Sequence, residues 1–241
     1  MIIEGSISVK AALLNNKRKV YAIHMIKKEG KDFDFILKKA AEKHVRTDFV
    51  SREKLESMVT GKTHGGIYAE VSGRMNDRIR SGDVLYLDGI EDPFNVGYIM
   101  RTAYALGLKN IILSPRDYNM LEGQILKSSA GAFDMMNVKV STDPVKDIRY
   151  LKAMGYHAYA LYRGEGSTDL FDTEFADKAV FVLGGEKRGI NAELLKVCDE
   201  YLHITYASNF RNALNACGAA DVVITMLYNQ RRKLIADNIA G

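Results

Sequence analysis

The sequence predicts an α/β protein with a parallel sheet, preceded by a smaller α/β domain. In the second part of the chain, short apolar runs alternate with segments of helical periodicity, which is the pattern of βαβ units. A polar stretch without periodicity, "GRMNDRIRSGD", separates this part from a shorter α/β pattern. The predicted domains are therefore residues 1–75 and 83–241, joined by a linker at 76–82.

The first domain is expected to contain two helices and two strands. Helical periodicity covers "SISVKAALLNN" and "FDFILKKAAEKHV". The apolar runs "VYAIHMI" and "GIYAEVS" are the expected strands, the second of them after the turn at Gly65-Gly66.

The second domain is expected to alternate strands and helices to its end. The expected strands are "DVLYLDGI", "NIILSP", "MNVKVS", "HAYALY", "AVFVLGG" and "YLHITY". The helices follow in "PFNVGYIMRTAYALG", "LEGQILKSSA", "PVKDIRYLKAMG" and from about Asn212 to Lys233. Ligands of such sheets bind at the carboxyl ends of the strands. Three loops are therefore of interest: "DGIEDPFNVG", "LGGEKRG" and "TYASNFRNALN".

Composition narrows the class of protein. The 241 residues are 47% hydrophobic and 27% charged, as in ordinary globular proteins, and no apolar run approaches the roughly 20 residues of a membrane helix. Since the first residues also lack the layout of a signal peptide, we expect a soluble, cytoplasmic protein without a membrane partner. Cys198 and Cys217 form no CxxC pair, which argues against a disulfide framework or a structural zinc. We interpret both as buried thiols.

Charge is distributed unevenly along the chain. Residues 1–80 contain 17 Lys and Arg against 10 Asp and Glu, whereas the remaining residues contain 17 and 20. The first domain therefore carries the excess of positive charge. Such clustering fits a surface that faces RNA phosphates, and it equally fits solvated lysine-rich helices.

The segment "DPFNVGYIMRTAYALG" has an apolar helical face and two polar residues that this face does not explain. Asn95 lies at the start of the predicted helix, and Arg101 points almost opposite the apolar face. From these residues alone, Asn95 is either an N-cap or a site residue. Arg101 is likewise either solvated or functional.

The glycine-rich loop "LGGEKRG" does not match a nucleotide-binding motif. The phosphate-loop pattern fails because Ile190 and Asn191 follow Gly189, and no GxGxxG follows the first strand of the second domain. The loop is then either a turn that needs positive φ or a ligand site of another kind. We expect His203, which lies within a predicted strand, to be packed rather than catalytic.

Taken together, "DPFNVGYIMRTAYALG", "FVLGGEKRGI" and "LHITYASNFRNALNACGAADVVITMLY" resemble the three ordered motifs of the SpoU, or TrmH-like, RNA ribose 2′-O-methyltransferases. The first domain resembles the L30e-like RNA-binding domain of that family. The resemblance implies a trefoil-knotted α/β fold, with S-adenosylmethionine bound in the knot. It also implies a substrate of structured RNA, with ribosomal RNA favoured over transfer RNA and DNA excluded.

The resemblance also assigns site residues. It implies a catalytic set of Asn95, Arg101, Glu186 and Asn215, and a cofactor-binding set of Leu183, Gly184, Gly185, Ile204, Tyr206 and Leu214. Arg101 would bind a phosphate and stabilise the developing alkoxide, because a guanidinium stays protonated. No metal is expected. A homodimer is expected from the family and from the broad apolar surface of "ADVVITMLYNQRRKL".

Three positions depart from the family pattern. Ala213 stands where the third motif usually has Ser, Thr205 where it has Pro, and Arg188 replaces a residue that is often acidic. Ser208 or Asn212 would have to supply the missing hydrogen bond. The alternative to an active methyltransferase is therefore a catalytically impaired RNA-binding paralogue with the same fold.

Overall fold

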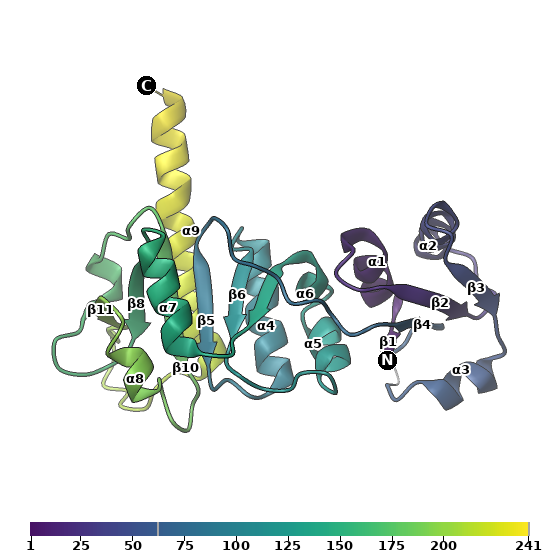
Figure 1. Ribbon diagram of the computed structural model, residues 1–241, viewed down its shortest axis with the longest axis horizontal. Helices are drawn as coiled ribbons and strands as arrows, with labels where there is room; N and C mark the ends of the chain where they lie inside the picture. The colour runs from purple at the N-terminus through teal and green to yellow at the C-terminus, as the bar shows by residue number, and fades with distance from the viewer. Residues whose placement is uncertain (62, 241) are drawn as a thin grey trace. The chain divides into compact units, whose positions relative to one another are not determined.

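The computed structural model describes residues 1–61 and 63–240, with side chains up to residue 233 (Figure 1). Residue 241, the last of the predicted second domain, lies outside the described residues. The chain forms two compact units. The first contains residues 1–75 and 117–135, and the second contains residues 76–116 and the chain from 136 onward.

The first unit is built on a four-stranded mixed sheet. Its strands lie in the order β1-β4-β2-β3, with only β2 and β3 parallel. The strands are β1 (Ile2–Glu4), β2 (Val20–Met25), β3 (Arg46–Phe49) and β4 (Ile67–Val71), and the helices are α1 (Ser6–Asn15), α2 (Lys31–Glu42) and α3 (Arg52–Met58). The predicted helices and strands are present, and β1, β3 and α3 were not predicted. These three elements are short, so periodicity gives little signal for them.

A segment from the middle of the chain completes the first unit. Helices α5 (Glu122–Ser128) and α6 (Ala132–Met135) pack against α1, and α5 also packs against β1. Arg18 has a fully buried side chain, and it donates to the carboxylates of Asp134 at 2.7 Å and of Glu122 at 2.8 Å. The predicted domain boundaries had assigned this segment to the second domain. Its buried carboxylates have their cationic partner in the first unit, which explains the difference.

The second unit is a seven-stranded parallel sheet with the order β7-β6-β5-β10-β8-β11-β9. The strands are β5 (Val84–Asp88), β6 (Asn110–Leu113), β7 (Asn137–Val140), β8 (His157–Leu161), β9 (Thr168–Asp169), β10 (Ala179–Gly184) and β11 (Glu200–His203). The helices are α4 (Pro93–Ala105), α7 (Pro144–Ala153), α8 (Ala192–Leu195) and α9 (Ala216–Ala240), with a 3₁₀ turn η1 (Leu170–Asp172). The predicted parallel α/β sheet is confirmed.

Helices cover both faces of this sheet, as its continuous apolar strands require (Figure 1). On one face, α7 and α8 pack over Tyr86, Val180 and Val182. On the other, α9 packs against α4 and β10. Because every strand is parallel, the loops after β5, β8, β10 and β11 leave the sheet at one edge.

The final helix begins later than predicted. Residues 212–215 are not helical, and α9 starts at Ala216, where the Asn215 side chain accepts from the backbone N–H of Gly218 at 2.7 Å. The side chain of Asn215 thus caps the helix. None of the described helices, α9 included, is long and apolar enough to cross a membrane.

Candidate functional site

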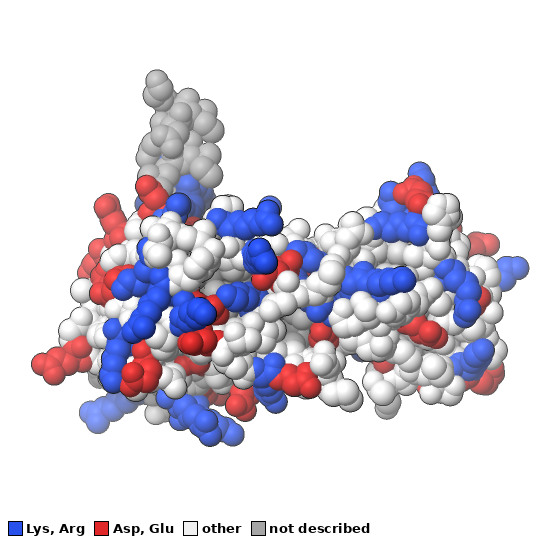
Figure 2. Space-filling view, viewed as in Figure 1, with Lys and Arg blue, Asp and Glu red and all other residues white. Residues whose placement is uncertain are grey.

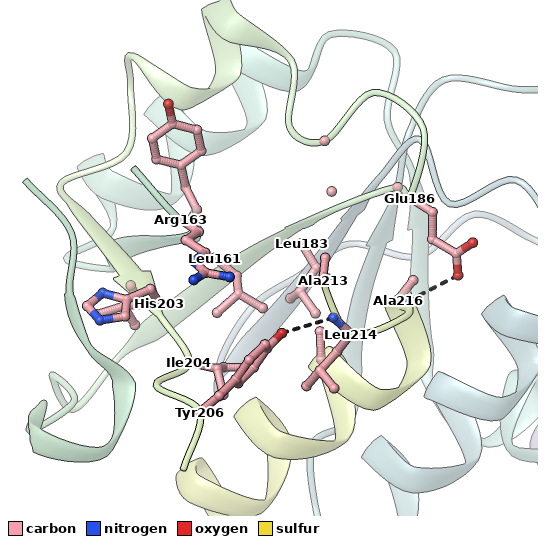
Figure 3. A pocket seen from close by; sticks show the side chains of 16 residues that line it. Leu161, Arg163, Leu183, Glu186, His203, Ile204, Tyr206, Ala213, Leu214 and Ala216 are labelled. Atoms are coloured by element: carbon pink, nitrogen blue, oxygen red, sulfur yellow. Dashed lines mark hydrogen bonds between the residues drawn. The ribbon is translucent and has the colours of Figure 1, made fainter. Parts of the chain in front are cut away.

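A cavity of about 240 Å³ opens at the carboxyl ends of β8, β10 and β11 (Figure 3). Its apolar wall consists of Leu161, Leu183, Leu202, Ile204 and Leu214. Its polar lining includes Arg163, Glu186, His203 and Tyr206, together with the backbone of three glycines. An apolar cavity with a few polar groups at the ends of parallel strands is the usual form of a small-molecule site.

The glycines of "LGGEKRG" are required by close backbone contacts. A Cβ atom on Gly184 would overlap the backbone of Gly189, and one on Gly185 would overlap the carbonyl group of Gly89 in the loop after β5. Neither residue has a positive φ; in this loop only Gly189 does, at 64°. The turn interpretation therefore holds for Gly189. Gly184 lets the loop after β10 fold back on itself, and Gly185 lets this loop meet the loop after β5 at the edge of the cavity.

Tyr206 forms one side of the cavity and is fixed by a hydrogen bond. Its hydroxyl oxygen accepts from the backbone N–H of Leu214 at 3.0 Å, so the extended segment before α9 is tied to the end of β11 (Figure 3). Ala213 and Ala216 also line the cavity. Their small side chains leave its interior open.

Three of the four residues expected to be catalytic meet at the first turn of α9. The Glu186 carboxylate accepts from the backbone N–H of Ala216 at 3.3 Å, and Asn215 caps the same turn. Asn95 lies in α4, where its side-chain oxygen is 3.5 Å from the thiol of Cys217, which donates to it. Hydrogen bonds with the β10 loop and with α4 therefore both fix the start of α9.

Asn95 is not the N-cap of α4, so that interpretation was wrong. The cap is Asp92, whose carboxylate accepts from the N–H groups of Phe94 and Asn95 at 2.7 and 3.1 Å, with Pro93 in the first turn. The side chain of Asn95 is thereby left to face Cys217. Arg101 lies six residues further along α4, which is about 9 Å of helical rise, and its side chain is exposed.

Asp88 anchors the base of the site at the end of β5. Its backbone oxygen accepts from Gly185 at 2.8 Å, and its carboxylate accepts from the backbone N–H of Asn191 at 2.6 Å. Burial raises the pKa of this carboxyl group, although the hydrogen bond from Asn191 opposes the shift. The residue thus joins the β5 loop to both ends of the β10 loop.

The structure brings all six residues of the expected cofactor set into one cavity wall, and Glu186 with them. Asn95, Arg101 and Asn215 do not line this cavity. The sequence interpretation missed Arg163, whose only available signal was its place at the end of a predicted strand. It also expected His203 to be packed; the ring is half-buried, lies 3.1 Å from the Ser167 hydroxyl and lines the cavity.

Neither residue expected to replace the missing serine reaches the cavity lining. Ser208 accepts from the backbone N–H of Phe210 at 3.4 Å and lines an adjoining cavity, and Asn212 is exposed. Ala213 itself lines the main cavity. That Ser208 or Asn212 supplies the hydrogen bond of the missing serine therefore remains a prediction.

The fold and the cavity define an α/β protein with a ligand site at the ends of its parallel strands, and comparison with known families makes the assignment specific. Residues 83–225 match the model of the SpoU rRNA Methylase family. Residues 2–75 match the model described as RNA 2′-O ribose methyltransferase substrate binding. Because the first match spans more than half of the chain, the chain belongs to the SpoU rRNA Methylase family. The resemblance predicted from the three motifs is confirmed.

Individual relatives agree over nearly the whole chain. A protein of Staphylococcus haemolyticus named as a TrmH family tRNA/rRNA methyltransferase is 28% identical, over 99% of this chain and 98% of its own length. The SpoU methyltransferase AviRb of Streptomyces viridochromogenes has a similar fold, with a TM-score of 0.81 at 19% identity, over 97% of this chain and 90% of its own. AviRb has also been solved in complex with AdoMet, and that structure matches with a TM-score of 0.80.

Proposed function

We propose that this protein transfers a methyl group from S-adenosylmethionine to a ribose 2′-hydroxyl of structured RNA, with ribosomal RNA favoured over transfer RNA. The observation that carries the proposal is the cavity. The six residues expected to hold the cofactor come from three separate segments and line one wall. Membership in the SpoU rRNA Methylase family and the AdoMet complex of AviRb support the same cofactor.

The residues of the cavity fit an adenosine thioether. Leu183, Ile204 and Leu214 present apolar side chains to a flat base, and Gly184 and Gly185 bring backbone polar groups to the same wall without side chains in the way. We assign the adenosine to this wall. The apolar lining would exclude water from the bound cofactor.

The cofactor would supply an electrophilic methyl group on a sulfonium, whose leaving group is a neutral thioether. The ribose oxygen forms the new O–C bond as the C–S bond breaks, and the hydroxyl proton passes to water. The protein then has to align the two reactants and stabilise the alkoxide. We assign the electrostatic part to Arg101. Glu186, Asn95 and Asn215 hold the first turn of α9 next to the cavity.

We propose a homodimer in which Arg101 of one copy lies at the cavity of the other. Arg101 lies outside the cavity lining of its own chain, on a helix that also exposes Phe94 and Tyr98 at 51% each. Helix α9, which packs against α4, exposes Tyr228 at 41%. These aromatic side chains support a symmetric interface through α4 and α9 in which one copy completes the site of the other. Sedimentation at micromolar concentration tests it, and a monomer would exclude it.

The first unit is proposed to bind the RNA. It carries most of the positive excess, with Lys27 and Lys28 exposed before α2 and Lys31 exposed as the first residue of this helix. Figure 2 shows basic and acidic side chains intermixed on the visible face, so the excess forms no continuous basic patch there. Replacing these three lysines by glutamate should weaken RNA binding and flatten its salt dependence while cofactor affinity stays unchanged. An unchanged salt slope would contradict the assignment.

Deleting residues 1–75 would not test this role. The buried carboxylates of Glu122 and Asp134 would lose Arg18, and unpaired buried charges destabilise the rest of the chain. Surface substitutions leave this network intact and are the better test.

Two further properties belong to the proposal. The first residue of α9, Ala216, is hydrogen-bonded to Glu186 of the β10 loop, and we infer that this last helix threads through a loop to form the trefoil knot of the family. The chain trace of a crystal structure would test the knot.

We also propose a cytoplasmic location, which cell fractionation would test.

Mass spectrometry of RNA digests tests the reaction. Ribosomal and transfer RNA are incubated separately with the protein and S-adenosylmethionine, and the ribosomal RNA should gain one methyl group on a ribose. A methyl group found on a base would contradict the ribose assignment.

The second candidate is a catalytically impaired RNA-binding paralogue. It is favoured by Ala213, which lines the cavity where the third motif usually has a serine with its hydroxyl. Binding of RNA and cofactor without any transfer would support that candidate.

A further inference from the structure

Arg163 is the cation of the cavity wall. It is the second residue after the end of β8, and its guanidinium group lies over the ring of Tyr206, 5.6 Å from the ring centroid. Within the part of the chain that the structure describes, Arg163 has no carboxylate partner. The acidic group of the same cavity, Glu186, accepts from the backbone of α9. The charge of Arg163 is thus not neutralised by the acidic side chain of its cavity.

The neighbours of Arg163 fix its direction. The ring of the preceding residue, Tyr162, packs edge-on against Tyr201 at 5.6 Å, and the following Gly164 leaves room for that ring, since a Cβ there would overlap it. The guanidinium lies over Tyr206, whose hydroxyl is held by Leu214. In Figure 3, Arg163 and Glu186 stand on opposite sides of the cavity. The arginine is therefore preorganised for an anion at the end of the cavity away from Glu186.

We propose that Arg163 pairs with the carboxylate of the cofactor's methionine group, so that the site selects adenosine thioethers that carry an intact amino acid. The inference rests on the proposed function. A carboxylate is the one anionic group of S-adenosylmethionine, and Arg163 is the one Lys or Arg among the described residues that line the cavity. The planar guanidinium matches a carboxylate through two parallel hydrogen bonds.

An RNA phosphate is the rival anion. Arg163 also lines the adjoining cavity, together with Ser167, Ser208 and Phe210. Ile204 and Tyr206 line both cavities, so they do not separate the two anions. The observations favour the carboxylate because only the main cavity also contains Leu183 and Leu214 of the wall assigned to the adenosine. The two anions predict different ligand dependences, which makes them separable by experiment.

The test compares two ligands that differ only in the carboxylate. Calorimetry of the full chain is performed with S-adenosylhomocysteine and with its decarboxylated analogue, for the wild type and for Arg163→Gln. The wild type should prefer S-adenosylhomocysteine by about tenfold, the size of a charge-assisted hydrogen bond at a partly exposed site. Arg163→Gln should lose this preference and bind the decarboxylated analogue as the wild type does, which also shows that the variant is folded.

Two control variants sharpen the result. Arg149→Gln makes the same change of charge at an exposed residue of α7 that does not line the cavity, and it should keep the full preference. Arg163→Lys keeps the charge and loses the planar fork, so it should keep only part of the preference.

Each outcome decides a different point. If the wild type binds neither ligand, the proposed cofactor is wrong. An equal preference in wild type and Arg163→Gln overturns only the role of Arg163. If Arg163→Gln binds both ligands as the wild type does and loses affinity for RNA, the arginine binds a phosphate and the carboxylate assignment is overturned.

Discussion

Replacing Gly185 by alanine should open the junction between the β5 and β10 loops. The added Cβ would overlap the carbonyl oxygen of Gly89, next to the hydrogen bond from Gly185 N–H to the Asp88 oxygen at 2.8 Å. A backbone carbonyl cannot rotate away as a side chain can, so the loops must separate. Overpacking of this kind costs roughly 1–3 kcal/mol of unfolding free energy.

The same strain should also lower the affinity for the cofactor. The displaced loop carries Gly184 and Glu186 of the cavity, and it has to return to its original place when the cofactor binds. About 1.4 kcal/mol of that strain corresponds to a tenfold loss of affinity. We therefore expect Gly185→Ala to lower affinity for S-adenosylhomocysteine by roughly tenfold, measured by calorimetry, and to lower stability, measured by urea denaturation.

The matched control is Gly123→Ala. Gly123 lies inside α5, has an ordinary φ and leaves normal van der Waals room for a methyl group, 3.7 Å from the backbone oxygen of Ile2. Alanine in a helix is favoured over glycine by up to about 1 kcal/mol, so this variant should be neutral or more stable. If Gly185→Ala matches the wild type in both stability and affinity, the close contact of the two loops is not what shapes the site.

Three further predictions concern the supports of the fold and the site. Arg18→Met should lower the unfolding free energy by about 3 kcal/mol in urea denaturation, because Asp134 and Glu122 lose their nearest cationic partner and, among the described residues, only Arg74 remains close to them; a loss below about 1 kcal/mol would contradict the buried network. Burial raises the pKa of Asp88, so its contribution to stability is greatest below the ordinary value of 3.8 and falls as the pH rises through the raised value. Asp88→Asn should remove this loss of stability with rising pH, and identical stability–pH curves of wild type and variant would refute the prediction. Tyr206→Phe removes the acceptor of the Leu214 N–H and should weaken S-adenosylhomocysteine binding about fivefold in calorimetry, whereas unchanged affinity would show that the ring alone suffices.

The parallel sheet and the cavity wall were predictable for a simple physical reason. Strands buried on both faces are continuous apolar runs, and the carboxyl ends of parallel strands lie at one edge. The loop "LGGEKRG" and the segment after "YLHI" were therefore expected at the same edge of the sheet. The individual residues Leu183, Ile204 and Leu214 came from the resemblance of the three motifs to the family.

Other features had no local signal. The pairing of Arg18 with Asp134 joins residues 116 positions apart, so nothing in the βαβ pattern shows that α5 and α6 belong to the first unit. Arg163 lies in no motif and becomes visible only when Tyr206 is seen beneath it. The helix cap at Asp92, by contrast, had a local signal that the sequence interpretation missed, since an acidic residue directly before a proline is a common helix start.

A crystal structure of the full chain with S-adenosylhomocysteine tests the central claim most directly. The account predicts the adenine between Leu183, Ile204 and Leu214, at the carboxyl ends of β10 and β11, with the ligand carboxylate next to Arg163. A ligand bound elsewhere on the chain, with this cavity closed or empty, would contradict it.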